Sequence, residues 1–198
     1  MRKSQKIYLP FKRLIGIVGS IIGIFVCFTF IWWWVFIINL FVTKGHPIFG
    51  SKRIGRNGKR FKLLKFRSMR IDADPEMTAG NENVEEYMTK FGKFLRRSSL
   101  DETLQLFNIL IGQMAFIGPR PLIDVGNDAI TNQKRRENGS ISLRPGISGY
   151  AQLHTRANLE CLSKAQYDYE YYQRISFWFD VKIFVLTIFS AFGVNAGK

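Results

Sequence analysis

The longest apolar stretch of the chain runs from Leu14 to Phe41 and contains no charged residue. As an α-helix this stretch would be about 40 Å long at ~1.5 Å per residue, which is enough to enter or cross a bilayer. It is too long for the apolar part of a cleaved signal peptide, and no small-residue cleavage site follows it. The pattern therefore predicts a membrane segment.

Basic residues flank this segment on both sides. They are Arg2, Lys3, Lys6, Lys12 and Arg13 before it, and Lys44, Lys52, Arg53, Arg56, Lys59, Arg60 and Lys62 after it. Because cationic flanks mark the cytoplasmic side of a membrane, two such flanks favour a helix that enters the bilayer and returns. Trp32, Trp33 and Trp34 fit this topology, since indole rings favour the interface. A single spanning helix, with the tryptophans near the far surface, is the alternative.

The pattern changes after the membrane segment. Two strand-like stretches in residues 49–66 surround Asn57-Gly58, the dipeptide best suited to a tight turn, and predict a β-hairpin. Residues 71–86 are acidic and contain structure breakers, which predicts a solvated loop leading into a helix.

Two later stretches have helical periodicity. In residues 85–97 the apolar positions recur at helical spacing, which predicts a helix that packs on the core or lies on a bilayer. These positions are Tyr87, Phe91, Phe94 and Leu95. Residues 175–193 are apolar but contain Asp180 and Lys182, and only about fifteen uncharged residues follow Lys182, fewer than the ~20 needed to span a membrane. This second helix is therefore expected to pack on the domain or lie in the interface.

Together these patterns predict an α+β fold that is mainly helical. Residues 1–44 would form an N-terminal basic segment and a membrane-inserted, re-entrant helix. Residues 45–198 would form a small cytosolic domain with a β-hairpin and amphipathic interfacial helices.

The amino-acid composition indicates that the protein has an anionic partner. The chain has 29 Lys and Arg against 15 Asp and Glu, a net charge of +14. Such a balance favours nucleic acid, phospholipid head groups or a phosphorylated substrate. Cys27 and Cys161 are far apart in sequence, which argues against a disulfide framework and for a reducing, cytosol-facing location.

Several short segments have features that suit phosphate binding. Lys65 and Arg67 alternate around a phenylalanine, so on a strand both cations would point to the same face. Arg120 lies between two prolines that stiffen the backbone. Arg144 opens the segment 144–149, whose glycines would allow the backbone to approach a ligand closely. Each segment alone is a weak signal, but their recurrence favours an anion site.

Asp101 and Glu102 admit a structural interpretation. Ser99 and Glu102 match the S-x-x-E capping box, and carboxylates in the first turn of a helix are favoured by the helix dipole. Both acids would then need no chemical role.

A catalytic interpretation rests on the residues that follow. A polar or small stripe at helical spacing consists of Asp101, Gln105, Asn108 and Gly112. Glu102 instead lies over Leu106 and Ile109, where desolvation would raise its pKa. A low-pKa nucleophile beside a higher-pKa proton carrier is a workable catalytic pair. From the pattern alone, both interpretations stay open.

Five ordered motifs follow the "FKR" that introduces the membrane segment. They are "KFRSM", "LRRSSLDETLQLFNIL", "GQMAFIGPRPL", "LRPGISGYAQL" and "YDYEYYQRISFWFDVKI". In this order they closely resemble the bacterial sugar transferase family, the monotopic phosphoglycosyl transferases. The resemblance covers residues 11–193.

The resemblance implies an enzyme at the cytoplasmic face of the inner (plasma) membrane, among membrane lipids and without a nucleic-acid partner. It would move a sugar-1-phosphate from a UDP-sugar to a polyprenyl phosphate, usually undecaprenyl phosphate, and release UMP. This is the first membrane step in the biosynthesis of glycoconjugates such as exopolysaccharide, capsule, O-antigen or glycoprotein glycans. Neither the sugar nor the oligomeric state follows from the sequence.

The resemblance also implies roles for particular residues. Asp101 would be the nucleophile that forms a covalent phospho-sugar intermediate and a Mg²⁺ ligand, with Glu102 as its partner. The cations that offset the charge of the diphosphate would be Lys65, Arg67, Arg96, Arg120 and Arg144. Gln152 and Asp168 also fall at motif positions and are further candidates for substrate binding.

The chain departs from the family pattern in its membrane segment. Gly16 stands where relatives that re-enter the bilayer commonly have an aspartate, and Phe28-Thr29 stands where they have a Ser-Pro break. Glycines and a serine in residues 16–23 could permit bending instead. Ser51 replaces a glutamine frequent in the hairpin. The motifs that contain the proposed catalytic residues are unchanged.

Two other classes of function compete with this hypothesis. A membrane-tethered basic module that binds anionic lipid or nucleic acid would account for the charge and the anchor, but not for two carboxylates among arginines. A glycosyltransferase that transfers the sugar alone would release UDP instead of UMP.

Overall fold

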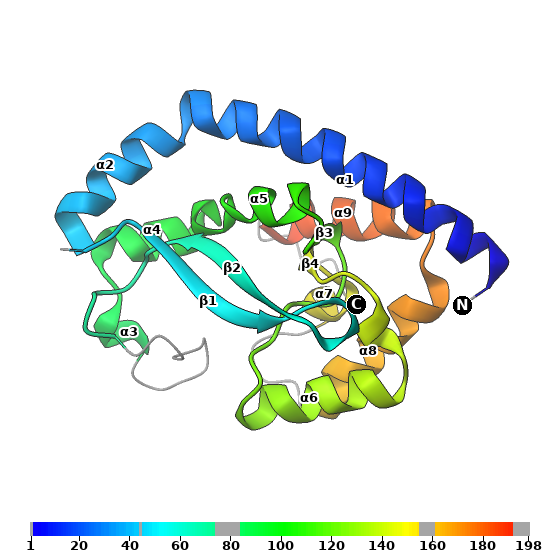
Figure 1. Cartoon of the computed structure of the whole chain (residues 1–198). Coiled ribbons are helices and arrows are strands. Elements are labelled where there is room, and N and C mark those ends of the chain that lie inside the picture. The colour runs from blue at the N-terminus through cyan, green and yellow to red at the C-terminus, as the bar shows by residue number, and fades with distance from the viewer. Residues whose placement is uncertain (1, 44, 74–83, 155–160, 192–198) are drawn as a thin grey trace.

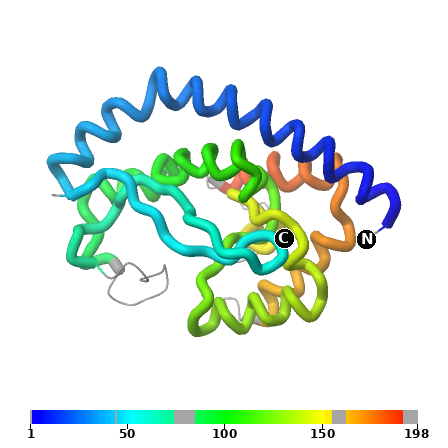
Figure 2. Tube along the Cα trace, in the orientation of Figure 1, coloured from blue at the N-terminus to red at the C-terminus, as the bar shows by residue number. Residues whose placement is uncertain are grey.

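The structure is a computed structural model that describes residues 2–43, 45–73, 84–154 and 161–191. As predicted, the fold is α+β and mainly helical. Two helices form an arch over a domain that contains a β-hairpin, a second pair of short strands and the remaining helices (Figure 1). The Cα trace shows the same arrangement without the ribbons (Figure 2).

The predicted membrane segment lies in the two helices of the arch. Helix α1 spans Lys3–Phe30 and α2 spans Trp32–Thr43, with a break at Ile31. By length and composition α1 could cross a membrane, and it is only slightly buried by the rest of the chain. Large apolar side chains such as Phe25, Phe30 and Phe41 are exposed. These features support association of the chain with a membrane.

The break occurs just after the position of the missing Ser-Pro pair, and not at the glycines. The Thr29 hydroxyl donates a hydrogen bond to the carbonyl of Phe25 at 2.8 Å, a contact that often bends helices. Beyond the break, the buried Trp32 donates from Nε1 to Oγ1 of Thr103 at 3.0 Å. This contact ties the start of α2 to the domain, so packing replaces proline as the cause of the bend.

The glycines of α1 serve close packing instead of bending. A Cβ on Gly16 would lie 3.5 Å from Ile109, and one on Gly23 would lie 3.0 Å from Leu106. A Cβ on Gly19 would meet the ring of Phe116 at 2.8 Å. The small residues therefore let α1 approach α5 (Gln105–Leu110) and β3 (Ala115–Ile117) closely.

Both ends of the arch are hydrogen-bonded to the same domain. Near one end, Gln5 Nε2 donates to the carbonyl of Gln173 at 2.7 Å. Near the other, Asn39 Nδ2 donates to the carbonyl of Arg67 at 2.8 Å. A helix that crossed the bilayer once would place its ends on opposite sides, so this arrangement favours the re-entrant topology. The domain boundary at residue 44 stays a prediction, and Trp32 belongs to the core of the domain.

The predicted hairpin is confirmed. Strands β1 (Ile48–Ile54) and β2 (Arg60–Phe66) are antiparallel, in register from Ile48 opposite Phe66 to Ile54 opposite Arg60. The connection contains the short 3₁₀ turn η1 (Arg56–Gly58), in which Asn57 and Gly58 have positive φ angles of 56° and 75°. These are the residues that the turn requires, since asparagine and glycine tolerate the left-handed region best.

The helix predicted over residues 85–97 is divided into α3 (Val84–Tyr87) and α4 (Lys90–Arg97). The reason is local, because the Thr89 side chain accepts a hydrogen bond from the Gly92 amide at 2.8 Å and begins α4 as an N-cap. Most of the predicted acidic loop, residues 74–83, lies outside the described residues.

The rest of the chain completes the domain. Its elements are η2 (Leu100–Glu102), α5, β3, α6 (Gly126–Glu137), η3 (Ser140–Ser142), β4 (Gly146–Ser148), α7 (Tyr150–His154), α8 (Cys161–Arg174) and α9 (Phe177–Ala191). Strands β3 and β4 are parallel. Helix α9 packs on the domain as predicted, with Ile183 buried and Trp178 exposed.

The glycines at 146 and 149 approach protein backbone, where the sequence predicted an approach to a ligand. A Cβ on Gly146 would lie 2.1 Å from the amide nitrogen of Gly118, and one on Gly149 would lie 2.2 Å from the Gly118 carbonyl oxygen. The close contact between the segments around β3 and β4 excludes any side chain there.

Candidate active site

The capping-box prediction is wrong. Ser99 has a left-handed φ of 56° and makes no side-chain cap, and Glu102 belongs to the 3₁₀ turn η2, whereas the α-helix begins only at Gln105. The chain must turn sharply between α4 and η2, and Ser99 takes the conformation that this turn requires. The side chain of Glu102 is therefore available for other contacts.

The polar stripe is buried and has more than one role. Asp101, Gln105 and Asn108 are 5%, 2% and 1% exposed. Asn108 serves the fold, because its Oδ1 accepts from the Leu64 amide at 3.1 Å and its Nδ2 donates to the Lys62 carbonyl at 2.8 Å. These bonds fix α5 on β2, and the charged end of the stripe at Asp101 then faces the cations of the hairpin.

Glu102 is held between two cations. Its Oε1 lies 2.6 Å from Lys65 Nζ and 3.6 Å from Arg120 Nη2. Burial acts to raise the pKa of Glu102, but the charges of Lys65 and Arg120 outweigh it and lower the pKa below its ordinary value. Glu102 therefore stays ionised at neutral pH.

Asp101 has a different environment. Within the described part of the chain, no other side chain donates a hydrogen bond to its carboxylate. Burial, helped by the negative charge of Glu102, raises the pKa of Asp101 against the opposing charges of Lys65 and Arg96. The sequence predicted the opposite order of pKa values, because it could not show that Lys65 and Arg120 both reach Glu102.

Arg96 and Arg53 extend the cationic surroundings of the pair. Arg96 is fixed by a hydrogen bond from Nε to Oγ of Ser68 at 3.0 Å. Arg53 was not among the predicted site residues, yet it lines a small cavity with Lys65, Glu102 and Arg120. The pairing of Phe49 with Lys65 puts Arg53 on the same face of the hairpin as Lys65, since alternate strand residues share a face. The strand alternation could have identified it.

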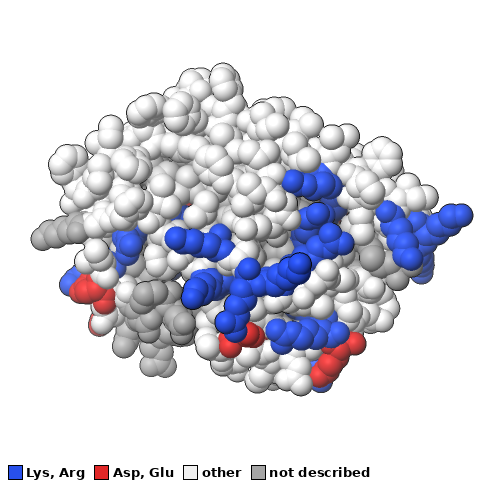
Figure 3. Space-filling view, viewed as in Figure 1, with Lys and Arg blue, Asp and Glu red and all other residues white. Residues whose placement is uncertain are grey.

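This cavity has a volume of about 30 Å³, close to the space that one water molecule occupies. Positively charged side chains gather over the hairpin below the uncharged surface of the arch (Figure 3).

Two further predicted site residues, Arg67 and Gln152, make hydrogen bonds to backbone carbonyls outside the carboxylate pair. Arg67 donates from Nε to the His46 carbonyl and lies over the Phe49 ring. Gln152 donates from Nε2 to the Ile147 carbonyl at 3.3 Å. None of these contacts joins Arg67 or Gln152 to the carboxylate pair, and their predicted roles in substrate binding stay predictions.

Arg144 and Asp168 are also engaged away from the pair. Arg144 donates from Nε to the Gly112 carbonyl at 2.9 Å and lines a second, larger cavity. Asp168 is 1% exposed and forms an ion pair with Arg135, whose Nη2 lies 2.5 Å from Oδ2. Arg135 also donates to the carbonyl of Arg120 at 3.0 Å. Through this chain of contacts Asp168 supports the segment that contains Arg120.

The described residues contain no group of three His, Cys, Asp or Glu that could hold a metal by themselves. Mg²⁺ usually binds to one or two carboxylates, several waters and substrate phosphates, so a complete protein cage is not needed. Asp101 fits such a site, because no neighbouring side chain in the described part of the chain occupies its oxygens. The Mg²⁺ cofactor stays a prediction.

Comparison with known proteins identifies the family. The chain matches the family described as bacterial sugar transferase over residues 7–193. The chain belongs to the bacterial sugar transferase family, and the resemblance drawn from the sequence motifs is confirmed.

Three relatives illustrate the range of the family. The chain is 36% identical over 203 residues to the galactosyl transferase CpsE of Streptococcus agalactiae serotype III, covering 93% of this chain and 44% of that protein. It is 38% identical over 156 residues to the UDP-glucose:undecaprenyl-phosphate glucose-1-phosphate transferase of Escherichia coli K12, covering 76% and 33%. It is 33% identical over 165 residues to the UDP-galactose-lipid carrier transferase of Erwinia amylovora, covering 73% and 33%. The chain thus spans less than half of each of these relatives.

Proposed function

We propose that the protein is a phosphoglycosyl transferase that moves a sugar-1-phosphate from a UDP-sugar to undecaprenyl phosphate. The observation that carries the proposal is the buried Asp101 beside an ionised Glu102, surrounded by Lys65, Arg96 and Arg120. The names of the relatives support the same reaction class. These names differ in the sugar, so the donor is assigned only as a UDP-sugar.

The first step forms a covalent intermediate on Asp101. A carboxylate oxygen attacks the phosphorus that bears the sugar, the bond between this phosphorus and the bridging oxygen of the diphosphate breaks, and UMP leaves with that oxygen. In the second step an oxygen of undecaprenyl phosphate attacks the same phosphorus. The bond to Asp101 breaks, the carboxylate is restored, and undecaprenyl diphosphate carries the sugar.

The environment of Asp101 suits a nucleophile. Its raised pKa means that the carboxylate is poorly stabilised by the protein, and a more basic carboxylate attacks phosphorus more readily. Repulsion between this anion and the diphosphate must be offset by cations, which Lys65, Arg96 and Arg120 supply. A bound Mg²⁺ would add a Lewis acid that neutralises phosphate charge, with Asp101 as its protein ligand.

Glu102 has a positioning role in this scheme. With a lowered pKa it is a poor proton carrier at neutral pH, so the proton-handling role considered from the sequence is not supported. Its carboxylate instead holds Lys65 and Arg120 on the same side of the cavity, where both can meet the incoming phosphates.

We place the enzyme at the cytoplasmic face of the plasma membrane, because the re-entrant arch would leave both basic flanks on the side that holds the soluble donor. In sealed vesicles, a lysine reagent that cannot cross the membrane should then label Lys6 and Lys52, both exposed, from the same side. Each lysine is scored by peptide mass spectrometry in intact and opened vesicles. Protection of only one of the two in intact vesicles would establish a spanning helix.

The leaving group tests the proposed function. The purified chain, Mg²⁺, undecaprenyl phosphate and a panel of UDP-sugars should yield UMP that depends on the lipid and one or a few sugars. Release of UDP would instead identify a transferase of the sugar alone. If no donor yields a nucleotide product, the proposed activity is refuted and the protein would be a membrane-tethered binding module.

Lys65→Met should move the acidic limb of the activity profile to higher pH. Lys65 lowers the pKa of both Asp101 and Glu102, so its removal raises both, and Asp101 becomes ionised only at higher pH. The loss of kcat/KM should therefore be larger on the acidic limb of the profile than at alkaline pH. Lys62→Met, on the opposite face of β2, is the matched control and should keep the parent profile. An equal loss at every pH would show that Lys65 acts only in binding.

A further inference from the structure

A second cavity lies apart from the carboxylate pair. It has a volume of about 430 Å³ and is enclosed by the first turns of α1, the end of the hairpin and the segments around β3 and η3. None of its lining residues lines the small cavity at Glu102. A ligand in this cavity would therefore be bound by residues other than those at the carboxylate pair.

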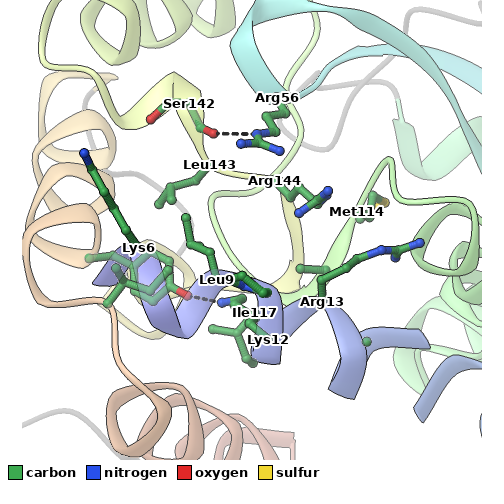
Figure 4. A pocket seen from close by; sticks show the side chains of 15 residues that line it. Lys6, Leu9, Lys12, Arg13, Arg56, Met114, Ile117, Ser142, Leu143 and Arg144 are labelled. Carbon is green, nitrogen blue, oxygen red and sulfur yellow. Dashed lines mark hydrogen bonds between the residues drawn. The ribbon is translucent and has the colours of Figure 1, made fainter. Parts of the chain in front are cut away.

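Cations without carboxylate partners surround this cavity. Lys6 and Arg13 belong to α1, Arg56 belongs to η1, and Arg144 lies between η3 and β4. Figure 4 shows Arg56, Arg144 and Arg13 on one side and Lys6 on the other. Among the ion pairs of the described residues, none includes these cations. Lys12, which also lines the cavity, differs because Asp180 neutralises it at 2.6 Å.

Backbone carbonyls fix the guanidinium groups in place. Arg56 donates from Nε to the Ser142 carbonyl at 3.1 Å, and Arg144 donates from Nε to the Gly112 carbonyl at 2.9 Å. Arg13 donates to the carbonyls of Ile109 and Leu110. Within the described chain the Nη groups of Arg56 and Arg144 make no hydrogen bond, so they remain available to an anion.

The cluster is electrostatically unfavourable by itself. Burial lowers the pKa of Arg144, and the like charges of Arg56 and Arg13 lower it further. An anion between these side chains would remove the repulsion and supply charge-assisted hydrogen bonds.

Much of the remaining wall is apolar, which argues for an amphiphilic anion. The apolar residues include Leu9, Met114, Ile117, Leu143 and Ile175. The cavity adjoins Lys6–Gly16 of α1, where the uncharged stretch begins at Leu14. This is the level at which lipid head groups would meet a re-entrant helix.

We propose that this cavity binds the head group of an anionic phospholipid, with the phosphate among Arg13, Arg56, Arg144 and Lys6 and the acyl chains directed along α1. The lipid would tie α1 to the hairpin and to the β3–β4 segments. The proposal concerns a bound lipid other than the acceptor, because an acceptor phosphate must reach the phosphorus on Asp101 and this cavity shares no wall residue with that site.

The test compares two variants of equal charge. The full chain in non-ionic detergent is titrated with dioctanoyl phosphatidylglycerol, and bound lipid is measured by native mass spectrometry. The double variant Lys6→Gln with Arg56→Gln should weaken binding at least about tenfold, since each cation contributes a charge-assisted contact. Lys52→Gln with Lys59→Gln, exposed hairpin lysines outside the cavity, should bind as the parent does. Dioctanoyl phosphatidylcholine, with the same chains, should bind far more weakly.

Additional variants and competing ligands control for folding and distinguish the possible ligands of the cavity. Arg56→Lys keeps the charge and should keep most of the affinity, and thermal unfolding without lipid checks that each variant is folded. The Asp101→Asn variant should bind the lipid normally, so loss of the proposed activity and loss of this site are distinguishable.

Equal binding by both double variants, or equal binding of phosphatidylcholine, would overturn the proposal. Displacement by millimolar inorganic phosphate would identify a free-phosphate site, and preferential displacement by a short polyprenyl phosphate would identify the acceptor; either result also overturns it.

Discussion

Asp101→Asn is expected to reduce UMP release at least about 10³-fold while leaving the protein folded. The amide cannot attack phosphorus, and removal of the carboxylate takes away the group on which the covalent intermediate would form. With the donor alone, the parent should gain the mass of a sugar phosphate, and the variant should not. Both UMP release and intact-protein mass measure this result.

Stability gives an independent check on the same variant. Because the pKa of Asp101 is raised in the folded chain, its ionisation opposes folding: the cost begins as the pH rises above the ordinary pKa and is complete above the raised value. The neutral amide has no such cost, so Asp101→Asn should unfold at the same or a higher temperature than the parent at pH 7. At low pH, where Asp101 is protonated in both the folded and the unfolded chain, this advantage of the variant should disappear. Such behaviour is common for catalytic groups that are held in unfavourable surroundings.

A matched control separates charge loss from loss of the nucleophile. Asp72→Asn removes an exposed carboxylate that pairs with Arg70, and it should keep the parent activity. UMP release from Asp101→Asn at the parent rate would refute the nucleophile assignment, whatever the result for Asp72.

Replacing Asp168 is expected to have the largest effect on stability. Asp168→Leu leaves Arg135 buried without its counter-charge, which costs about 3–5 kcal/mol for a buried ion pair. The double variant with Arg135→Met removes both charges and should recover most of the loss. Chemical unfolding of the full chain in detergent measures the free energy of each variant.

The comparison also tests what Asp168 does. Asp124→Asn, at a partly exposed carboxylate paired with Arg60, should change stability by no more than about 1 kcal/mol. A stable Asp168→Leu variant that has lost only donor affinity would assign Asp168 to substrate binding, as the family motif suggested. The expected pattern is instead a stability loss, with activity reduced because Arg135 no longer holds the carbonyl of Arg120 in place.

Local patterns were sufficient for several features of this protein. The uncharged stretch predicts a membrane segment because nearly every side chain in it is apolar, and Asn57-Gly58 predicts the hairpin turn because both residues tolerate positive φ. Asp101 and Glu102 are consecutive in the chain, so the sequence alone showed that the two carboxylates belong to one site. Each of these conclusions depends on neighbours in the chain.

Other features depend on residues that are distant in sequence. Strand pairing and the position of η2 bring Lys65 and Arg120 to Glu102, which reverses the predicted order of the pKa values. The break at Ile31 follows from the packing of Trp32 against Thr103 and from the Thr29 contact, without a proline. The buried ion pair of Asp168 with Arg135 also joins residues that are far apart in sequence, and no local pattern indicated it.

By itself, then, the sequence determined the long apolar segment, the hairpin, the motifs of the family and the pair of carboxylates. Only the tertiary structure decided which cations reach which carboxylate, and which arginines gather at the second cavity instead. The physical reason is that periodicity and turn propensity are local, whereas pKa values, ion pairs and cavities depend on distances between segments that folding alone brings together.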